Sequence, residues 1–302
     1  MNDSTTRLDA AAWSMLLLLS VLWGGSFLYV KIALEELPPV TIVALRALFG
    51  GAFLFVILRL RGLTLSRDPA LWKGFAVLAL LNTVLPFILI AWGQREISAG
   101  LAAILNAATP LWTITLAHFL TDDERMDARR AAGVLIGFSG VVVLVGPEAL
   151  AGIGSSVLAQ LACVAATISY GFALVWARRF KGQDGTVLAS GQFICAIPAT
   201  MALSFAVDRP WTLPMPGTAT MLSIFGLAFL STAVAYLVYY RLMQRAGAGN
   251  ASLVTMLIPP SAVLLGIAFL GERFEPLSVA GFALIAAGLA VVDGRVLGLF
   301  RR

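Results

Sequence analysis

Polar side chains interrupt long apolar runs of this sequence at spacings that would align them on helix faces. Asn106 and Thr109 lie three residues apart, and Thr255 and Pro259 lie four apart, so an α-helix would place each pair on one face. Amide and hydroxyl groups in apolar surroundings hydrogen-bond either a small polar solute or a neighbouring helix. The sequence leaves both uses open.

A wider set of polar and aromatic side chains extends this pattern to other apolar runs. Flat aromatic faces combined with a few hydrogen-bonding groups suit small amphiphilic solutes. Trp and Tyr near helix ends also act as anchors at membrane interfaces, which remains an alternative. The expected lining of a solute cavity is Trp23, Ser26, Asn82, Thr83, Phe87, Asn106, Thr109, Tyr170, Thr232, Tyr236 and Thr255.

Two basic residues lie in or near apolar runs, where an unpartnered charge is costly. Arg46 lies well inside such a run, so it needs a counter-charge or backbone carbonyls. It would either attract a substrate carboxylate or have a structural role, pairing with Glu35 or Glu36 or capping helix ends, and the structural role is the one we expect. Lys31 lies closer to the edge of its run and can extend its ammonium to the interface.

Three prolines fall inside apolar runs, at Pro86, Pro110 and Pro259. Proline lacks a backbone N–H and disrupts the helical hydrogen bond four residues back, so each favours a kink or hinge. The carbonyls freed in this way are available to a substrate. Simple packing kinks are the alternative.

Catalytic and metal-binding patterns are not found in the sequence. All acidic residues fall in tails, loops or the edges of apolar runs, and His118 is the only histidine. Cys163 and Cys195 each lie in an apolar run, where a thiol is inert. We therefore expect no catalytic residue, metal or cofactor, and an intramembrane lipid-modifying enzyme, which needs a nucleophile or metal motif, is an unfavoured alternative.

These residues must be positioned by membrane-spanning helices. The 302-residue chain is 60% hydrophobic and 12% charged, with a mean hydropathy of +0.92, whereas soluble domains are about 25% charged. Backbone groups in a bilayer must be satisfied within the chain, so apolar runs of about 20 residues form helices. We predict an all-α membrane domain over 1–302 with spans at 13–34, 40–59, 70–93, 98–120, 129–145, 155–177, 186–207, 217–240, 250–270 and 276–297.

The distribution of basic residues predicts the orientation of these spans. Sixteen of the 21 Lys and Arg residues fall on the side of the N-terminus and four on the other, with Arg46 inside a span. Because cytoplasmic loops are enriched in basic residues, both termini are expected in the cytoplasm. The net charge of +5 is thus explained by topology, and nucleic-acid binding is not expected.

The two halves of the chain resemble each other in sequence. A shift of 147 to 149 residues aligns Trp23 with Tyr170, Asn82 with Ser231 and Pro110 with Pro259, with intervening matches. We therefore predict two five-helix repeats, 13–145 and 155–297, and an odd number of spans makes them antiparallel. In such folds the substrate binds near the midplane between the repeats, and one repeat rocks against the other.

The order of these motifs resembles the drug/metabolite transporter superfamily, specifically its EamA-type ten-helix members. The motifs are the Trp-Gly pair before Lys31, the Pro-Pro turn before Arg46, and the Glu-Arg plus Gly-x6-Gly pattern ending each half. The resemblance covers residues 13–292 and is closest to bacterial aromatic amino acid exporters. It implies export of amino acids or similar metabolites across the bacterial inner membrane. A multidrug or other metabolite carrier, or a receptor-like subunit, remains open, as does the oligomeric state.

Overall fold

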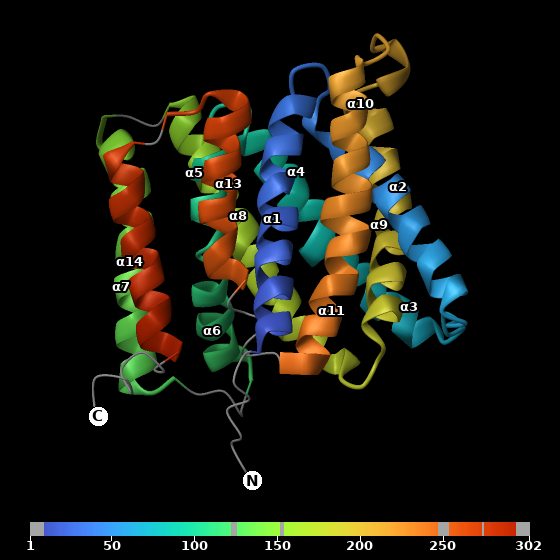
Figure 1. The fold of residues 1–302 in the computed structure, drawn as a ribbon, viewed down its shortest axis with the longest axis horizontal. Helices are drawn as coiled ribbons and strands as arrows, with labels where there is room; N and C mark the ends of the chain where they lie inside the picture. The colour runs from blue at the N-terminus through green and yellow to red at the C-terminus, as the bar shows by residue number, and fades with distance from the viewer. Residues whose placement is uncertain (1–8, 122–125, 152–153, 247–253, 274, 294–302) are drawn as a thin grey trace.

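The computed structural model describes residues 9–121, 126–151, 154–246, 254–273 and 275–293. Within these ranges the chain forms helices joined by loops, and no strand (Figure 1). We call the end where α1 finishes at Ala33 the upper end, and the end where it begins the lower end. The α-helices are α1 (Ala10–Ala33), α2 (Pro39–Leu60), α3 (Pro69–Ala79), α4 (Leu85–Gly93), α5 (Ala99–Asn106), α6 (Thr109–Leu120), α7 (Ala128–Ala151), α8 (Ser155–Ala177), α9 (Gly185–Val207), α10 (Thr218–Phe225), α11 (Ala235–Ala246), α13 (Val254–Leu270) and α14 (Pro276–Asp293).

The helices overlap each of the segments predicted from hydropathy, with bounds shifted by a few residues. Among the described residues, seven helical runs are long and apolar enough to cross a membrane, and two shorter apolar helices cover 254–270 and 276–292. Those seven runs are Ala10–Ala33, Pro39–Leu60, Pro69–Gly93, Ala99–Leu120, Ser155–Phe180, Gly185–Val207 and Thr218–Leu242.

Local sequence explains where several helices begin and end. Asp9, Asp68 and Asp184 precede α1, α3 and α9, and each side chain accepts a hydrogen bond from a backbone N–H of the first turn. After α2 and α13 the chain turns at Gly62 and Gly271, whose φ angles of 68° and 64° suit glycine because it has no Cβ.

The span predicted over 98–120 corresponds to one apolar run, Ala99–Leu120, which a short turn at 107–108 divides into α5 and α6. Pro110 lies in the first turn of α6 and cannot donate to the carbonyl of Asn106. The Thr109 hydroxyl donates to that carbonyl instead, at 2.8 Å. This local replacement satisfies the backbone where the helix is interrupted. Pro259, its partner in the repeat, lies inside the continuous helix α13.

Two helical runs contain π-helical segments that the sequence did not predict. Segment η1 (Leu80–Val84) separates α3 from α4, and Pro86 follows in the first turn of α4. Segment η4 (Gly226–Val234) joins α10 to α11. The shift of 149 residues places η1 within η4, so both halves widen the helix at the same place. Such segments occur frequently at functional sites.

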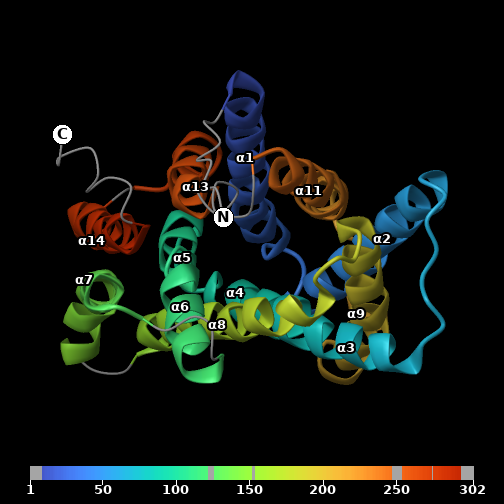
Figure 2. The same cartoon turned by 90° about the horizontal axis from the view of Figure 1, so that it is seen from below.

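Helices α7 and α14 pack backbone to backbone through glycines. A Cβ added to Gly288 would lie 2.4 Å from the nitrogen of Gly137 and 2.5 Å from the carbonyl oxygen of Gly133. A Cβ added to Gly140 would lie 2.6 Å from the carbonyl oxygen of Gly281. The two helices stand together at one side of the molecule (Figure 2).

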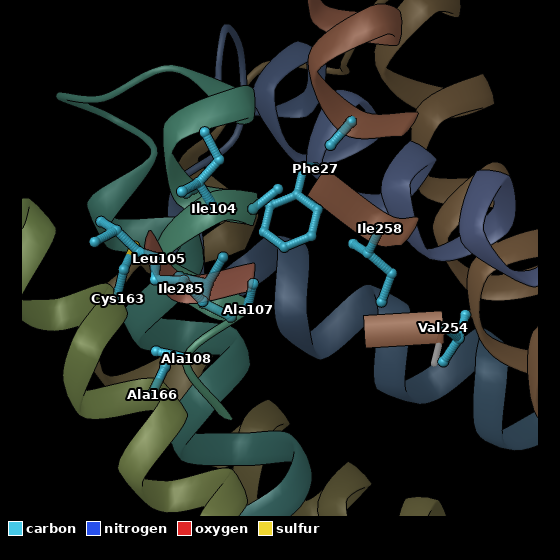
Figure 3. Packing of buried hydrophobic residues seen from close by; sticks show 14 of the residues in the cluster. Phe27, Ile104, Leu105, Ala107, Ala108, Cys163, Ala166, Val254, Ile258 and Ile285 are labelled. Carbon is cyan, nitrogen blue, oxygen red and sulfur yellow. The ribbon is translucent and has the colours of Figure 1, made fainter. Parts of the chain in front are cut away.

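The remaining helices mix the two sequence halves. Helix α1 packs on α13 and on α10 and α11, whereas α8 packs on α4, α5 and α6. Seen from below, these form two groups that face each other across the bundle (Figure 2). At one side of it, Phe27, Ile104, Cys163, Ile258 and Ile285 bring α1, α5, α8, α13 and α14 into one buried core (Figure 3).

Helices α2 and α9 also pair across the two halves and are joined at both ends. At the upper end, Asp208 accepts hydrogen bonds from the backbone N–H and hydroxyl of Thr41, at 2.7 and 2.8 Å. At the lower end, Arg61 forms an ion pair of 3.2 Å with Asp184. A motion that separates the two sequence halves as rigid bodies would break both contacts.

Candidate solute-binding site

Arg46 of α2 is buried at the centre of the bundle, with 7% of its surface exposed. Its Nε donates to the Thr232 hydroxyl of η4 at 3.1 Å, and its guanidinium carbon lies 3.8 Å from the centre of the Phe87 ring of α4. Such a cation over an aromatic face is favourable. The residue therefore connects three elements of the bundle.

The expected pairing of Arg46 with Glu35 or Glu36 is wrong. Neither carboxylate forms an ion pair with Arg46, and Glu36 lies in the loop after α1. The Thr220 hydroxyl and the N–H of Gly217 hydrogen-bond Glu36 instead and hold its pKa below the ordinary 4.5. The Glu36 carboxylate stays at the upper surface because it finds hydrogen-bond partners there.

Close approach of α2 and η4 makes the contact between Arg46 and Thr232 possible. Gly50 lies one turn below Arg46, and a Cβ there would lie 3.0 Å from the methyl carbon of Thr232. The Thr232 hydroxyl also donates to the carbonyl of Leu227 at 2.8 Å, five residues earlier. The π-helical segment thus holds this hydroxyl in place as an acceptor for the guanidinium.

A chain of polar side chains lies beside Arg46. The Asn82 amide donates to Oε1 of Gln192 at 3.2 Å and to the Tyr236 hydroxyl at 3.5 Å. The Gln192 amide in turn donates to the Thr83 hydroxyl at 2.6 Å. Sequence reasoning missed Gln192, although an amide in the apolar run of α9 carries the same signal as an asparagine.

Aromatic rings form a wall next to this polar chain. Tyr236 lies 6.3 Å from Trp23 and 5.9 Å from Phe193, ring centre to ring centre, with edge-to-face geometry. Trp23 also contacts Tyr239 at 5.3 Å. Trp23, Tyr236 and Tyr239 are partly exposed although they lie within the bundle. Phe193 and Tyr239 were not predicted, because aromatic residues of apolar runs usually face lipid or core.

The structure gathers some predicted lining residues and separates others. Tyr170 is half-buried and lies within electrostatic range of Arg46. Ser26 donates to the carbonyl of Trp23 in its own helix, at 2.6 Å, so it is satisfied locally, as Thr109 is. Oδ1 of Asn106 is buried without a partner among the described residues. Thr255 is half-buried near the start of α13.

The Lys31 ammonium is bound by backbone carbonyls at the upper end of the bundle. It donates to the carbonyls of Gln94 and Ile97, at 2.6 and 2.9 Å, just after α4 ends. Cations at a helix C-terminus are favourable because the last carbonyls lack partners. The Gln94 amide donates back to the carbonyl of Phe27 at 2.9 Å. Together these bonds fasten α1 to α4 at the upper end.

A second fastening at the upper end uses Glu272, which follows α13. Its carboxylate accepts the backbone N–H groups of Ala99 and Gly100, at 2.6 and 3.1 Å, in the first turn of α5. Carboxylates are favoured at helix N-termini. The duplicated Glu-Arg motif did not reveal this contact, because sequence does not tell which helix end lies opposite. We call the Lys31 and Glu272 bonds the upper latch.

The site offers binding groups rather than reactive ones. Within the described ranges, no group of three His, Cys, Asp or Glu side chains is arranged to hold a metal ion. His118 lies away from this cluster, at the end of α6, where its Nδ1 accepts the backbone N–H of Met126 at 3.0 Å. The acidic run 121–124 lies largely outside the described residues. We call the side chains around Arg46 the central cluster. It combines one cation, two amides, hydroxyls and aromatic faces, from Arg46, Asn82, Gln192, Thr83, Thr232, Trp23, Phe87, Phe193 and Tyr236.

Both halves of the chain match a known family of transporters. A family model described as the EamA-like transporter family matches the chain twice, over residues 11–146 and 157–292. The probable amino-acid metabolite efflux pump of Escherichia coli K12 is 27% identical over 285 residues, covering 91% of this chain and 92% of that protein. The probable terminal-alkyne amino-acid exporter of Streptantibioticus cattleyicolor is 27% identical over 215 residues, covering 70% and 69%.

A solved crystal structure has a similar fold. Its TM-score is 0.66 at 21% identity, and the match covers 95% of this chain and 99% of that one. The uncharacterized transporter YoaV of Bacillus subtilis is 22% identical over 275 residues, covering 89% of this chain and 92% of its own. These two matches and that to the Escherichia coli protein each cover 89% or more of this chain.

Proposed function

Since the chain belongs to the EamA-like transporter family, we propose that it is a secondary transporter that exports amino acids or similar small metabolites across the bacterial inner membrane. The observation that carries the proposal is the central cluster, where Arg46, Asn82 and Tyr236 from three helical runs meet beside partly exposed aromatic rings. Aromatic faces combined with a few polar groups suit small amphiphilic solutes. The names of the two exporters above agree with amino acids as substrates.

The proposed architecture is ten spans in two inverted repeats, with both termini in the cytoplasm. Two features support it besides the basic-residue distribution. The family model matches each half separately. Moreover, the packing of α1 on α13 has its repeat counterpart in the packing of α8 on α6, and η1 has its counterpart in η4.

The proposed transport mechanism is alternating access, with moving units that differ from the sequence halves. Because α2 pairs with α9 and α7 with α14 across the halves, these pairs form a frame. The units that move are α1 with α10, α11 and α13, and α8 with α3 to α6. In the present arrangement the upper latch joins the two units, so the state is closed at the upper, external end.

Counterflow in liposomes tests the function. Purified protein in vesicles loaded with unlabelled amino acid should accumulate the labelled one, because exchange on a carrier moves label against its gradient. Asn82→Ala should slow this exchange about tenfold or more, since it removes two hydrogen bonds that position Gln192 and Tyr236. Ser14→Ala, on an exposed site that bonds only its own helix, is the matched control and should exchange normally.

Two outcomes would contradict the proposal. Wild-type protein that gives no exchange of any amino acid or similar metabolite above empty vesicles is not such a carrier. Equal exchange by wild type and Asn82→Ala would place the binding site elsewhere.

A further inference from the structure

We propose that Arg46 binds the carboxylate of the substrate, so that the solutes carried are small organic acids, amino acids included, with an apolar or aromatic group. The inference rests on the proposed function and adds the chemical class that the central cluster selects. It reverses the structural role expected from sequence.

Arg46 is a buried cation with no acidic partner in the part of the chain that the structure describes. Its recorded neighbours within the described ranges are a hydroxyl, an aromatic ring and the tyrosines Tyr170 and Tyr236. A buried charge normally has a counter-charge, because its loss of hydration is otherwise poorly compensated. A residue with this cost and no structural pair is explained by a partner that arrives from outside.

Most of the hydrogen-bond donors of Arg46 have no acceptor among the described residues. A guanidinium carries five N–H donors in a planar fork. Nε donates to Thr232, and neither Nη1 nor Nη2 has a hydrogen-bond acceptor in the described part of the chain. Phe87 covers the guanidinium face and not its edge. The free Nη edge matches the two oxygens of a carboxylate, which binds such a fork bidentately.

Groups near Arg46 suit the ammonium group and the side chain of an amino acid substrate. The Asn82 amide nitrogen is used in two hydrogen bonds, whereas its Oδ1 has no donor within the described ranges. This oxygen is available to an ammonium group. The wall of Trp23, Phe193 and Tyr236 offers flat apolar surface to a side chain.

The same arrangement disfavours cationic drugs. A solute with a positive charge and no carboxylate would meet Arg46 in a region of low dielectric, where like charges repel strongly. No acidic side chain is recorded beside Arg46 within the described ranges to offset that repulsion. A multidrug carrier for organic cations is therefore the less favoured alternative.

The test compares phenylalanine with phenylalaninamide, and leucine with leucinamide, as competitors of amino acid counterflow. Each amide keeps the ammonium and side chain and loses the carboxylate charge. In wild type the acid should inhibit counterflow at a concentration about 30-fold or more below that of its amide, as expected for a buried charge pair. In Arg46→Gln this ratio should fall to near 1, and in Arg46→Lys, which keeps charge but not the fork, it should fall in between.

Thermal melting of ligand-free protein separates recognition from structure. Arg46→Gln should melt no lower than wild type, because burying the unpaired charge costs more than the hydrogen bond to Thr232 and the contact with the Phe87 ring contribute. A lower melting temperature together with an unchanged acid-to-amide ratio would overturn the proposal. If Arg46→Gln does not fold, an unchanged ratio in Arg46→Lys overturns it equally. Absence of exchange by wild type would instead refute the proposed function.

Discussion

Replacing Gly288 with valine should destabilise the protein by about 3 kcal/mol, among the largest effects of any single change in the bundle. The new Cβ alone would lie 2.4 Å from the nitrogen of Gly137 and 2.5 Å from the carbonyl oxygen of Gly133. Both contacts are with backbone, which cannot move aside as a flexible side chain can. Helices α7 and α14 must therefore separate, and they lose contact along their length.

Thermal unfolding in detergent measures this effect, and Gly154→Val is the matched control. Gly154 precedes α8 at a φ of −94°, and a Cβ there meets no atom within 4 Å. The control should change stability by less than about 0.5 kcal/mol. If Gly288→Val has the same melting temperature as the wild type and the control, the two helices do not pack through their glycines.

Glu272→Ala should open the upper end of the transporter. The carboxylate accepts the N–H groups of Ala99 and Gly100, and hydrogen bonds to a charged group contribute roughly 1.5–3 kcal/mol. Loss of this stabilisation shifts the balance between closed and open states about 10- to 100-fold. Backbone amides at the start of α5 should then exchange their hydrogens faster by the same factor.

Hydrogen exchange followed by mass spectrometry tests the latch. Glu275→Ala is the control, because it removes the same charge from the same loop at an exposed position. Peptides that contain Ala99 and Gly100 should exchange faster in Glu272→Ala and unchanged in Glu275→Ala. Equal exchange in both variants would mean that Glu272 does not hold the two units together.

Sequence patterns predicted the helices well and their interruptions poorly. Apolar runs are a local property of the sequence, so the helices that they form could be predicted without coordinates. Pro110 breaks its helix whereas Pro259 leaves α13 continuous, although the two are repeat mates. The difference depends on neighbouring helices, which a single run of residues does not describe.

The candidate site was partly predictable for a related reason. Polar residues in apolar runs identified Asn82, Tyr236 and Arg46, because burial makes them costly wherever they lie. The partners predicted for Arg46 were wrong. Its observed partners, Phe87 and Thr232, lie far from it in the sequence. Gln192 could have been found by treating glutamine as asparagine was treated. The contact of Glu272 with α5 required the structure.

We propose that the site around Arg46 opens to one side of the membrane at a time. This is tested most directly by labelling Ser26→Cys with a membrane-impermeant thiol reagent, after Cys163→Ala and Cys195→Ala remove the native thiols. Ser26 is partly exposed and lies one turn above Trp23, on the face toward the central cluster.

Spheroplasts present the external side of the membrane to the reagent, and inside-out vesicles present the cytoplasmic side. If the upper latch closes the external end, as we propose, labelling from the cytoplasmic side should be at least about tenfold faster, and Glu272→Ala should reduce or reverse that ratio. Equal labelling from both sides in wild type, unchanged by Glu272→Ala, would indicate a fixed pore and contradict alternating access.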